Sequence, residues 1–556
     1  MHKRSYQKIA LSTGIASVLL FGTTACSSGS SNSSSSSNSS SSAAPITMFA
    51  SPAASVENLN TNWFTKYVEK KFDMKIQWDT VPSSDIQTKQ SLLLASGNYP
   101  DVFMAGSLSN SDVLKYSQEG IFVPLNDLIK KYAPNLWKAI QTTPGLKQEV
   151  FAPDGKIYAL PSYNYCFFCS YSNIMWVNTD LLKKYDLQMP TTTAQLTHVL
   201  QVFKQHGIIP MTGDTDGWNG NPTNFLMNAF IYDANFDIDN SGKMYFAPTQ
   251  EKWKQGLAYI HNLYAQNLLD HQAFSQQESV VEREVGQNKV GMVPEGDISH
   301  AIANFAQTGF GPWRPVPPLK GPNGVQYAGF SPPQPGSDVF AITNKASQAQ
   351  EIKVMKLLNF IWTPDGTQML NYGPEGKYWT KAKKGQLGLM GTQALYNMTA
   401  AGTAAFVTAG AQQNVSWYQM GPYDNAEVSR DGMVAAPPFT DAGLWSTLQL
   451  FSQESYAGHQ PKYVYPSAVW IPSSENQQYS VYSTNINNFL QQWTTSFIDG
   501  SKSLDKDWNT YVQGLNHLGL QQYVKMSQDA MGKPFDTSAY KKDPADEKFL
   551  ESLIKK

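Results

Sequence analysis

The sequence predicts an α/β protein, and three observations lead to that prediction. Short apolar strands alternate with amphipathic helices in the region after residue 45, which is typical of a largely parallel sheet covered by helices. Longer amphipathic helices dominate the second half of the chain. The body from about residue 45 to residue 556 is long enough for two or more domains.

The first elements follow from local patterns. A strand is expected at 46–49, and a helix across 58–72 because its aromatic residues share one helical face. Alternating apolar residues predict a second strand at 73–81. The segment 85–105 has the pattern of a helix, a turn and a strand.

Helix caps mark three later helices. Thr192 with Gln195 forms the pattern of a capping box, and Gly207 ends that helix. The segment 249–269 has an amphipathic helical period, and Ser347 is expected to cap a third helix. No repeat typical of solenoids or propellers is present.

The N-terminus has the layout of a secretory signal, with basic residues, a short apolar run and then small residues. Residues 1–25 are the predicted signal. The letters TTAC resemble a lipoprotein lipobox that would lipidate Cys26, although Thr23 stands where leucine is usual. The serine-rich stretch 26–45 cannot bury apolar surface and is predicted to be a disordered tether. The alternative is an ordinary secreted protein cleaved near Ala25.

Composition narrows the function classes. The formal net charge is −2, so there is no basic excess to neutralise phosphates, and nucleic acid is not an expected partner. Charged residues are 15% and aromatic residues 12% of the chain, a balance that suits a sugar-facing surface but also an aromatic core. No serine-hydrolase motif, phosphate loop or metal-ligand spacing appears, so no cofactor and no metal are expected.

Cys166 and Cys169 form a CxxC pair. No second CxxC accompanies it, and two phenylalanines occupy the positions between the cysteines. Outside the cytosol a local disulfide is the favoured interpretation. Two free thiols, or a redox or metal-binding pair, remain open.

A series of ordered segments resembles the carbohydrate-binding group of bacterial extracellular solute-binding proteins of ABC importers. The segments read GNYPDVFMAG, GIFVPLNDLIKKYAP, APDGKIYALPSYN and MWVNTDLLKKYDLQMPTTTAQL. Two later ones, LLNFIWTPDGTQMLNYGPEGKYWT and FIDGSKSLDKDWNTYVQGLNHLGLQQYV, resemble the large lipoprotein branch that includes alginate-oligosaccharide binding proteins. The resemblance covers nearly the whole mature chain.

The resemblance implies a two-lobed periplasmic-binding-protein-like fold with a ligand cleft between the lobes. Lobe one would comprise 46–175 plus 330–425, and lobe two 176–329 plus 426–545, followed by a tail at 546–556. Chain crossings are expected near Tyr163–Val177, Gly329–Gly336 and Gln419–Arg430.

The resemblance also implies partners and a location. The expected partners are an oligosaccharide ligand and the transmembrane subunits of an ABC permease, and the chain is expected to be a monomer. The membrane would be met only through the N-terminal lipid anchor. The expected location is the outer face of the cytoplasmic membrane, on the surface of a Gram-positive bacterium.

The calcium loop of the alginate-type branch is absent after the letters FK, where the chain reads FKQHGIIPMTGD. The stretch from Asp237 superficially resembles an EF-hand loop. Pro248 occupies the position of its final glutamate, so a β-turn in a hairpin is favoured there.

A sugar site needs aromatic faces and polar side chains in one cleft. Loops near the expected crossings supply both, and each tryptophan has packing in a core or at a lobe edge as its alternative role. The candidate ligand-binding residues are Tyr163, Asp214, Trp218, Asn219, Glu295, Trp313, Arg314, Glu375, Trp379, Trp417 and Trp470. Tyr165, Asp216, Asp297, Tyr378 and Tyr418 stand in the same loops.

The predicted function is therefore capture of an oligosaccharide for import, without catalysis. A secreted polysaccharide-active enzyme is the main rival, and it would need two carboxylates beside the scissile bond, for which Asp214, Glu295 and Glu375 are the candidates. A structural surface lipoprotein, and the same family with a peptide or other cargo, are further alternatives.

Overall fold

The structure is a computed structural model. It describes residues 44–143, 145–163, 169–302, 311–332, 335–389, 391–406, 411–423, 432–436, 443–467 and 469–541, the side chains of 335–338, 444 and 445 excepted. Residues 44–556 form one compact unit.

The first sheet has the order β2-β1-β3-β11-β4. Its strands are β1 (Ile46–Ala50), β2 (Ile76–Thr80), β3 (Val102–Ala105), β4 (Ala159–Tyr163) and β11 (Pro335–Ile342). β1 pairs in parallel with β2 and β3, whereas β11 is antiparallel to β3 and β4. The three strands expected in the first part of the chain are confirmed, and β11 brings a distant segment back into the same sheet.

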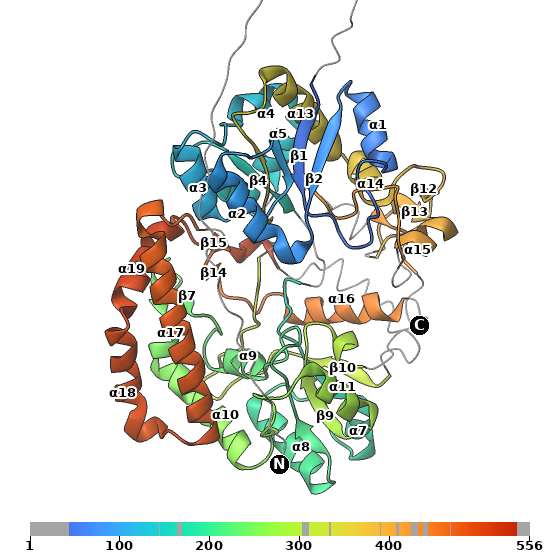
Figure 1. The fold of residues 1–556 in the computed structure, drawn as a ribbon. Coiled ribbons are helices and arrows are strands. Elements are labelled where there is room, and N and C mark those ends of the chain that lie inside the picture. The colour runs from blue at the N-terminus through green and yellow to red at the C-terminus, as the bar shows by residue number, and fades with distance from the viewer. Residues whose placement is uncertain are drawn as a thin grey trace, which may run out of the picture. The chain divides into compact units, whose positions relative to one another are not determined.

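Helices pack around this sheet (Figure 1). They are α1 (Trp63–Lys71), α2 (Ile86–Ser96), α3 (Asn110–Gln118), α4 (Asn126–Tyr132), α5 (Pro134–Thr142), α6 (Leu146–Val150), α13 (Gln348–Ile361) and α14 (Pro364–Tyr372). The predicted cap of α13 is confirmed, because Ser347 and Gln350 exchange side-chain and backbone hydrogen bonds as a capping box. A small pair of strands, β12 (Trp379–Lys381) and β13 (Tyr396–Met398), and α15 (Ala400–Phe406) follow.

The second sheet has the order β10-β5-β9-β6. Its strands are β5 (Met175–Asn178), β6 (Ile209–Met211), β9 (Val290–Pro294) and β10 (Trp313–Val316). A further sheet joins β7 (Phe236–Ile238), β8 (Met244–Phe246), β14 (Tyr463–Val464) and β15 (Phe535–Asp536). β7 and β8 form the hairpin expected after Asp237, and Asp239 accepts hydrogen bonds from Ser241 and Lys243 within its turn.

The helices of this part include the long C-terminal set visible in Figure 1. They are α7 (Thr179–Lys184), α8 (Thr193–Gln205), α9 (Thr223–Leu226), α10 (Glu251–Ala265), α11 (Glu278–Gly286), α16 (Leu444–Tyr456), α17 (Ser473–Asp499), α18 (Leu504–His517) and α19 (Leu520–Met531). Thr192 caps α8 as predicted, but Gln195 accepts from Thr191 rather than closing the box on Thr192. Within the described residues, no helix is both long and apolar enough to cross a bilayer.

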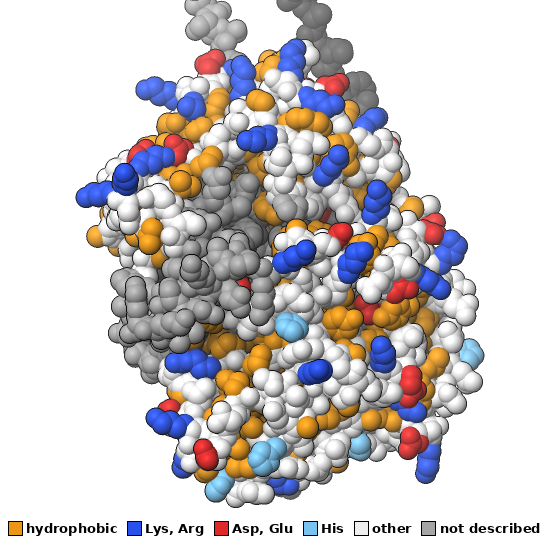
Figure 2. Space-filling model, turned by 180° about the vertical axis from the view of Figure 1, so that it is seen from behind, with side chains coloured by type: hydrophobic (Ala, Val, Ile, Leu, Met, Phe, Trp, Pro, Cys, Tyr) orange, Lys and Arg blue, Asp and Glu red, His pale blue; other side chains and the backbone are white. Residues whose placement is uncertain are grey.

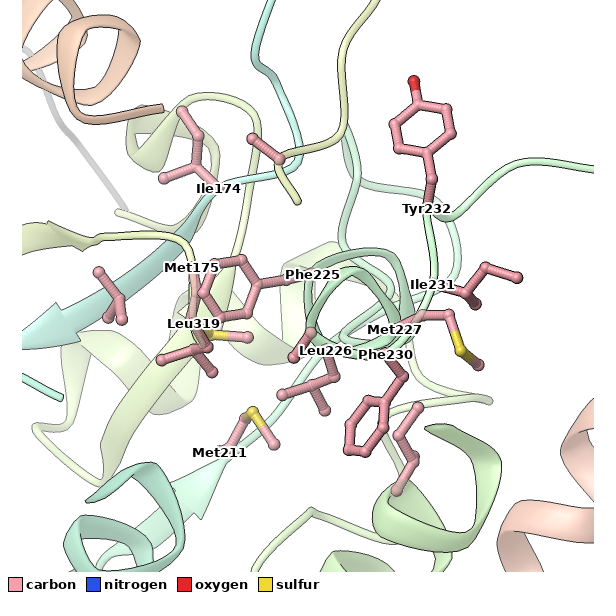
Figure 3. Close-up of a cluster of buried hydrophobic side chains, with 14 of the residues drawn as sticks. Ile174, Met175, Met211, Phe225, Leu226, Met227, Phe230, Ile231, Tyr232 and Leu319 are labelled. Carbon is pink, nitrogen blue, oxygen red and sulfur yellow. The ribbon is translucent and has the colours of Figure 1, made fainter. Parts of the chain in front are cut away.

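The buried side chains form separate cores in the two parts of the chain. One core lies around β5, β6, β9 and α10, and Figure 3 shows Met175, Met211, Phe225 and Leu319 pointing toward one another within it. The main core of the first sheet contains side chains from β1, β3, α4, α5 and α13, and a smaller cluster accompanies it. We therefore treat the chain as two lobes, each with its own core.

The described residues that follow the expected third crossing contact two different parts of the chain. Met433 bridges to Tyr396, and the amide of Ala435 donates to the carbonyl of Leu387, so this stretch still pairs beside β13. Helix α16 packs on β10, and the Tyr456 hydroxyl donates to the Val316 carbonyl. The third crossing expected near Gln419–Arg430 stays a prediction, because residues 424–431 lie outside the described part.

Replacing Asn62 by alanine is expected to lower the free energy of unfolding by about 1–3 kcal/mol. Asn62 is fully buried, accepts from the Phe64 amide at the start of α1 and donates to the Ser416 carbonyl. The matched control is Ser347→Ala, an exposed cap without such a cross-link, for which about 1 kcal/mol is expected. Urea denaturation measures both, and equal losses would contradict the cross-linking role.

Candidate functional site

The position of the candidate site follows from the direction of the strands in the second lobe. β6 and β9 are parallel, so the loops that follow them, 212–221 and 295–298, leave the same edge of the sheet. β5 is antiparallel to β9, so the chain enters β5 at Met175 on this edge. We call this the crossing edge of lobe two.

Lobe one has a matching edge. The parallel strands β1, β2 and β3 end there at Ala50, Thr80 and Ala105. β4 ends and β11 begins at this edge, because Tyr163 pairs with Pro335. The chain therefore leaves lobe one and returns to it at the carboxyl ends of its parallel strands, where ligands bind in open α/β sheets.

Asp214 organises the loop 212–221. It is almost completely buried, and its amide donates to the Gly220 carbonyl at 2.9 Å. Its Oδ1 accepts from the amides of Asp216 at 3.2 Å and Gly217 at 2.6 Å. A Cβ on Gly220 would lie 2.3 Å from the same oxygen, so the loop needs glycine there to close around the carboxylate.

Glu295 lies beside Asp214 inside the lobe. Its side chain has no exposed surface, and neither carboxyl oxygen has a hydrogen-bond partner that meets ordinary geometry. A Cβ on Gly217 would lie 2.6 Å from Asp214 Oδ1 and 2.8 Å from Glu295 Oε1, so the two carboxyl groups flank that glycine. Burial and the nearby Asp214 carboxylate raise the pKa of Glu295 to about 10, and the group is therefore protonated at neutral pH.

Trp218 rests on the residue that follows Glu295. The Gly296 amide donates to the Trp218 carbonyl at 2.6 Å, and a Cβ at Gly296 would lie 2.6 Å from the indole ring. The indole is half-buried, and its centroid is 6.4 Å from that of His300. Glycine at position 296 thus lets the ring lie against the backbone while part of it stays accessible.

Asn219 links the same loop to the first crossing. Its side-chain amide donates to the Ser172 carbonyl at 3.1 Å, and its φ of 62° is in the left-handed region that asparagine tolerates better than most residues. Asp297 follows Gly296 and accepts from the Ser299 amide at 2.9 Å. The loop, the crossing and the end of β9 therefore form one connected surface.

The surroundings of Trp218 are acidic. Asp216 is exposed, and its Oδ1 accepts from the Glu278 amide at 2.7 Å. Glu278 in turn lies 3.0 Å from His300 Nδ1. Because His300 is also the ring neighbour of Trp218, the carboxylate of Glu278 lies on the His300 side of the indole.

Two predicted site residues lie at the other end of the second sheet. Trp313 pairs with Asn178 and Arg314 with Val177, so both are remote from Met175 along β5. Trp313 is buried, and Arg314 donates to the carbonyls of Gly311 and Trp313. Register, which the sequence does not reveal, removes both from the crossing edge.

Two further tryptophans are core residues. Trp417 has no exposed surface, donates from Nε1 to Thr65 Oγ1 at 2.8 Å and packs edge-on against Phe64 and Trp78. Trp379 is equally buried and donates to the Gly373 carbonyl. In this structure both rings lack the exposed face that a bound sugar would need, contrary to their prediction as ligand contacts.

The remaining candidates are scattered. Glu375 is exposed beside β12. Tyr163 is buried at the end of β4, where its amide donates to the Tyr423 carbonyl. Trp470 is half-buried and lines a cavity of about 790 Å³ between residues 145–153 and 526–536. These residues do not join the Trp218 loop.

The cysteine predictions are only partly within the described residues. Cys169 is disulfide-bonded. Cys166, its expected partner, and Cys26, the expected lipidation site, lie outside the described part. No group of three or more His, Cys, Asp or Glu side chains that could hold a metal occurs among the residues that the structure describes.

Several contributors to the site were missed from the sequence. Ser172, Glu278, Gly296 and His300 meet the loop only through folding. Gly296 stands between two predicted residues, Glu295 and Asp297, and this position in the sequence could have indicated it. No local signal marked the other three.

These features define a class of protein, one with two α/β lobes joined by chain crossings at the carboxyl ends of parallel strands. The family described as bacterial extracellular solute-binding protein matches residues 57–368 of the 556. The chain belongs to this family, and the resemblance expected from the sequence is confirmed.

One curated relative is named for a carbohydrate ligand. The fructooligosaccharide ABC transporter substrate-binding protein FusA of Streptococcus pneumoniae serotype 4 (strain ATCC BAA-334 / TIGR4) is 33% identical over 243 residues, which cover 41% of this chain and 45% of that protein. The chain thus spans less than half the length of this relative.

Solved structures share the fold. An HMO-binding solute-binding protein associated with an ABC transporter, from Bifidobacterium longum infantis ATCC 15697, matches with a TM-score of 0.70 at 18% identity, covering 90% of this chain and 100% of that one. The alginate-binding protein AlgQ2 matches with a TM-score of 0.61 at 22% identity, covering 88% and 98%. The two-lobed periplasmic-binding-protein-like fold is therefore shown.

Proposed function

We propose that the chain is the substrate-binding component of a carbohydrate ABC importer and captures an oligosaccharide between its lobes. The observation that carries this proposal is the half-buried Trp218, held against Gly296 beside Asn219 at the crossing edge. A flat ring next to an amide suits the apolar face and the hydroxyls of a sugar. The family match and the ligand names of the relatives support the same substrate class.

The proposed mechanism is differential affinity. A ligand that contacts both crossing edges binds the closed arrangement of the lobes better than the open one, and it shifts the population toward closure. The closed form would then be recognised by the transmembrane subunits of the permease. Lipidation at Cys26 and a tether over residues 26–45 would keep a monomeric chain at the cell surface.

The enzyme alternative is not favoured, because two of its three candidate carboxylates are buried. Glu295 is fully buried and Asp214 is almost so, and the two carboxyl groups flank Gly217. Glu375 lies beside β12, outside the loop that holds Asp214 and Glu295. We therefore propose binding without bond cleavage.

Thermal unfolding of residues 44–556 against an oligosaccharide panel tests the function. A ligand that binds only the native state raises stability by about 2.7 kcal/mol at a hundredfold excess over Kd. The expected result is a clear rise in Tm with one class of sugar, which chromatography then recovers uncut. A cut sugar would make the protein an enzyme, and no shift with any sugar would remove the carbohydrate assignment.

A further inference from the structure

We propose that the bound oligosaccharide is uncharged and that acidic side chains around Trp218 reject uronate-bearing sugars. This inference rests on the proposed function and names its substrate class. The shared fold does not decide the question, because the relatives include one named for fructooligosaccharide and one named for alginate, a polyuronate. The choice between a neutral and an acidic sugar rests on the charged side chains at the crossing edges.

The loops at the crossing edges contain no lysine or arginine in the described part of the chain. They hold acidic residues instead, among them Asp85, Asp216 and Asp297. The loops concerned are 51–56, 81–85 and 106–109 in lobe one, 212–221 and 295–298 in lobe two, and the adjoining segments 169–174 and 411–423.

The lysines and arginines of the described chain lie outside these loops. Elsewhere, Lys and Arg side chains are scattered singly over the face drawn in Figure 2 rather than gathered in one patch. Arg314, the cation first considered for an acidic cargo, is at the far end of β10.

A sugar carboxylate needs a compensating partner when it leaves water. Proteins supply that partner mostly as a bidentate arginine or a lysine. Here a carboxylate near Trp218 would meet Asp216 and Glu278, and His300, whose ring neighbours Trp218, already contacts Glu278. Like charges placed together are strongly unfavourable in a binding site. Neutral hydroxyls have no such cost and can use the amide of Asn219.

The test is isothermal titration calorimetry of residues 44–556 with matched tetrasaccharides at low and at physiological salt. The neutral sugars are nystose and maltotetraose, and the acidic sugars are tetragalacturonate and tetramannuronate. We expect a neutral sugar to bind at least about tenfold more tightly than every uronate. Uronate binding within threefold of the best neutral sugar, or tighter, overturns the inference and leaves the proposed function intact. Binding of neither class overturns both.

Charge-neutralised variants test the stated cause. Asp216→Asn combined with Glu278→Gln is expected to lower the ratio of neutral-sugar to uronate affinity at least about threefold. Glu251→Gln, an exposed acid at the start of α10, is the matched control and should change neither affinity. Unchanged discrimination in the double variant would overturn the role of these carboxylates.

Discussion

Replacing Glu295 by glutamine is expected to stabilise the protein increasingly as the pH rises from 5 to 8. The native pKa of Glu295 is about 10 against an ordinary value of 4.5, so between these values the folded state keeps a proton that the unfolded chain releases. The contribution of this group to stability is therefore complete below about pH 4.5 and is progressively lost until about pH 10. At pH 7 the loss is of the order of 3 kcal/mol.

Glutamine has nearly the same shape and needs no proton to stay neutral. Its amide can also donate to the Oδ2 atom of Asp214, which lacks a partner. Urea denaturation of parent and variant at several pH values measures the effect. Glu251→Gln, an exposed acid at the start of α10, is the control and should not reproduce this pH-dependent gain in stability. A difference between Glu295→Gln and the parent that stays constant with pH would show that Glu295 is ionised in the folded state.

The second large effect concerns Trp417 and Trp218, which the sequence alone does not distinguish. Trp417→Ala is expected to cost about 3–5 kcal/mol, because the ring is fully buried against Phe64 and Trp78 and its loss leaves the Thr65 hydroxyl without its indole partner. Trp218→Ala is expected to leave stability within about 1 kcal/mol but to raise Kd for the sugar at least about tenfold. Urea denaturation and calorimetric titration measure the two quantities.

A third tryptophan provides the control. Trp493 is half-buried on α17, where its ring packs against Phe489 and Tyr511. Trp493→Ala should therefore lower stability modestly without changing sugar affinity. If Trp218→Ala binds the sugar as tightly as the parent, the proposed site is wrong even if the family function stands.

Much of the fold could be predicted because its signals are local. The alternation of strand and helix between β1 and β3, and the caps of α8 and α13 at Thr192 and Ser347, depend on residues only a few positions apart. A hydrophobic period or a cap acts within one or two turns, so single-chain patterns determine where these elements form. The loop around Trp218 was also identifiable, since its glycines and polar residues exclude a core role.

The site required contacts that no local pattern specifies. Asp214 and Glu295 meet because β6 and β9 are parallel neighbours, and Trp313 is excluded because β10 pairs with β5 in one particular register. Trp417 and Trp218 stand in similarly polar loops, yet one is core and the other half-exposed. The sequence by itself determined the elements, the family and the loop that presents Trp218. Only the tertiary structure decided which side chains are buried, because burial depends on packing between segments distant along the chain.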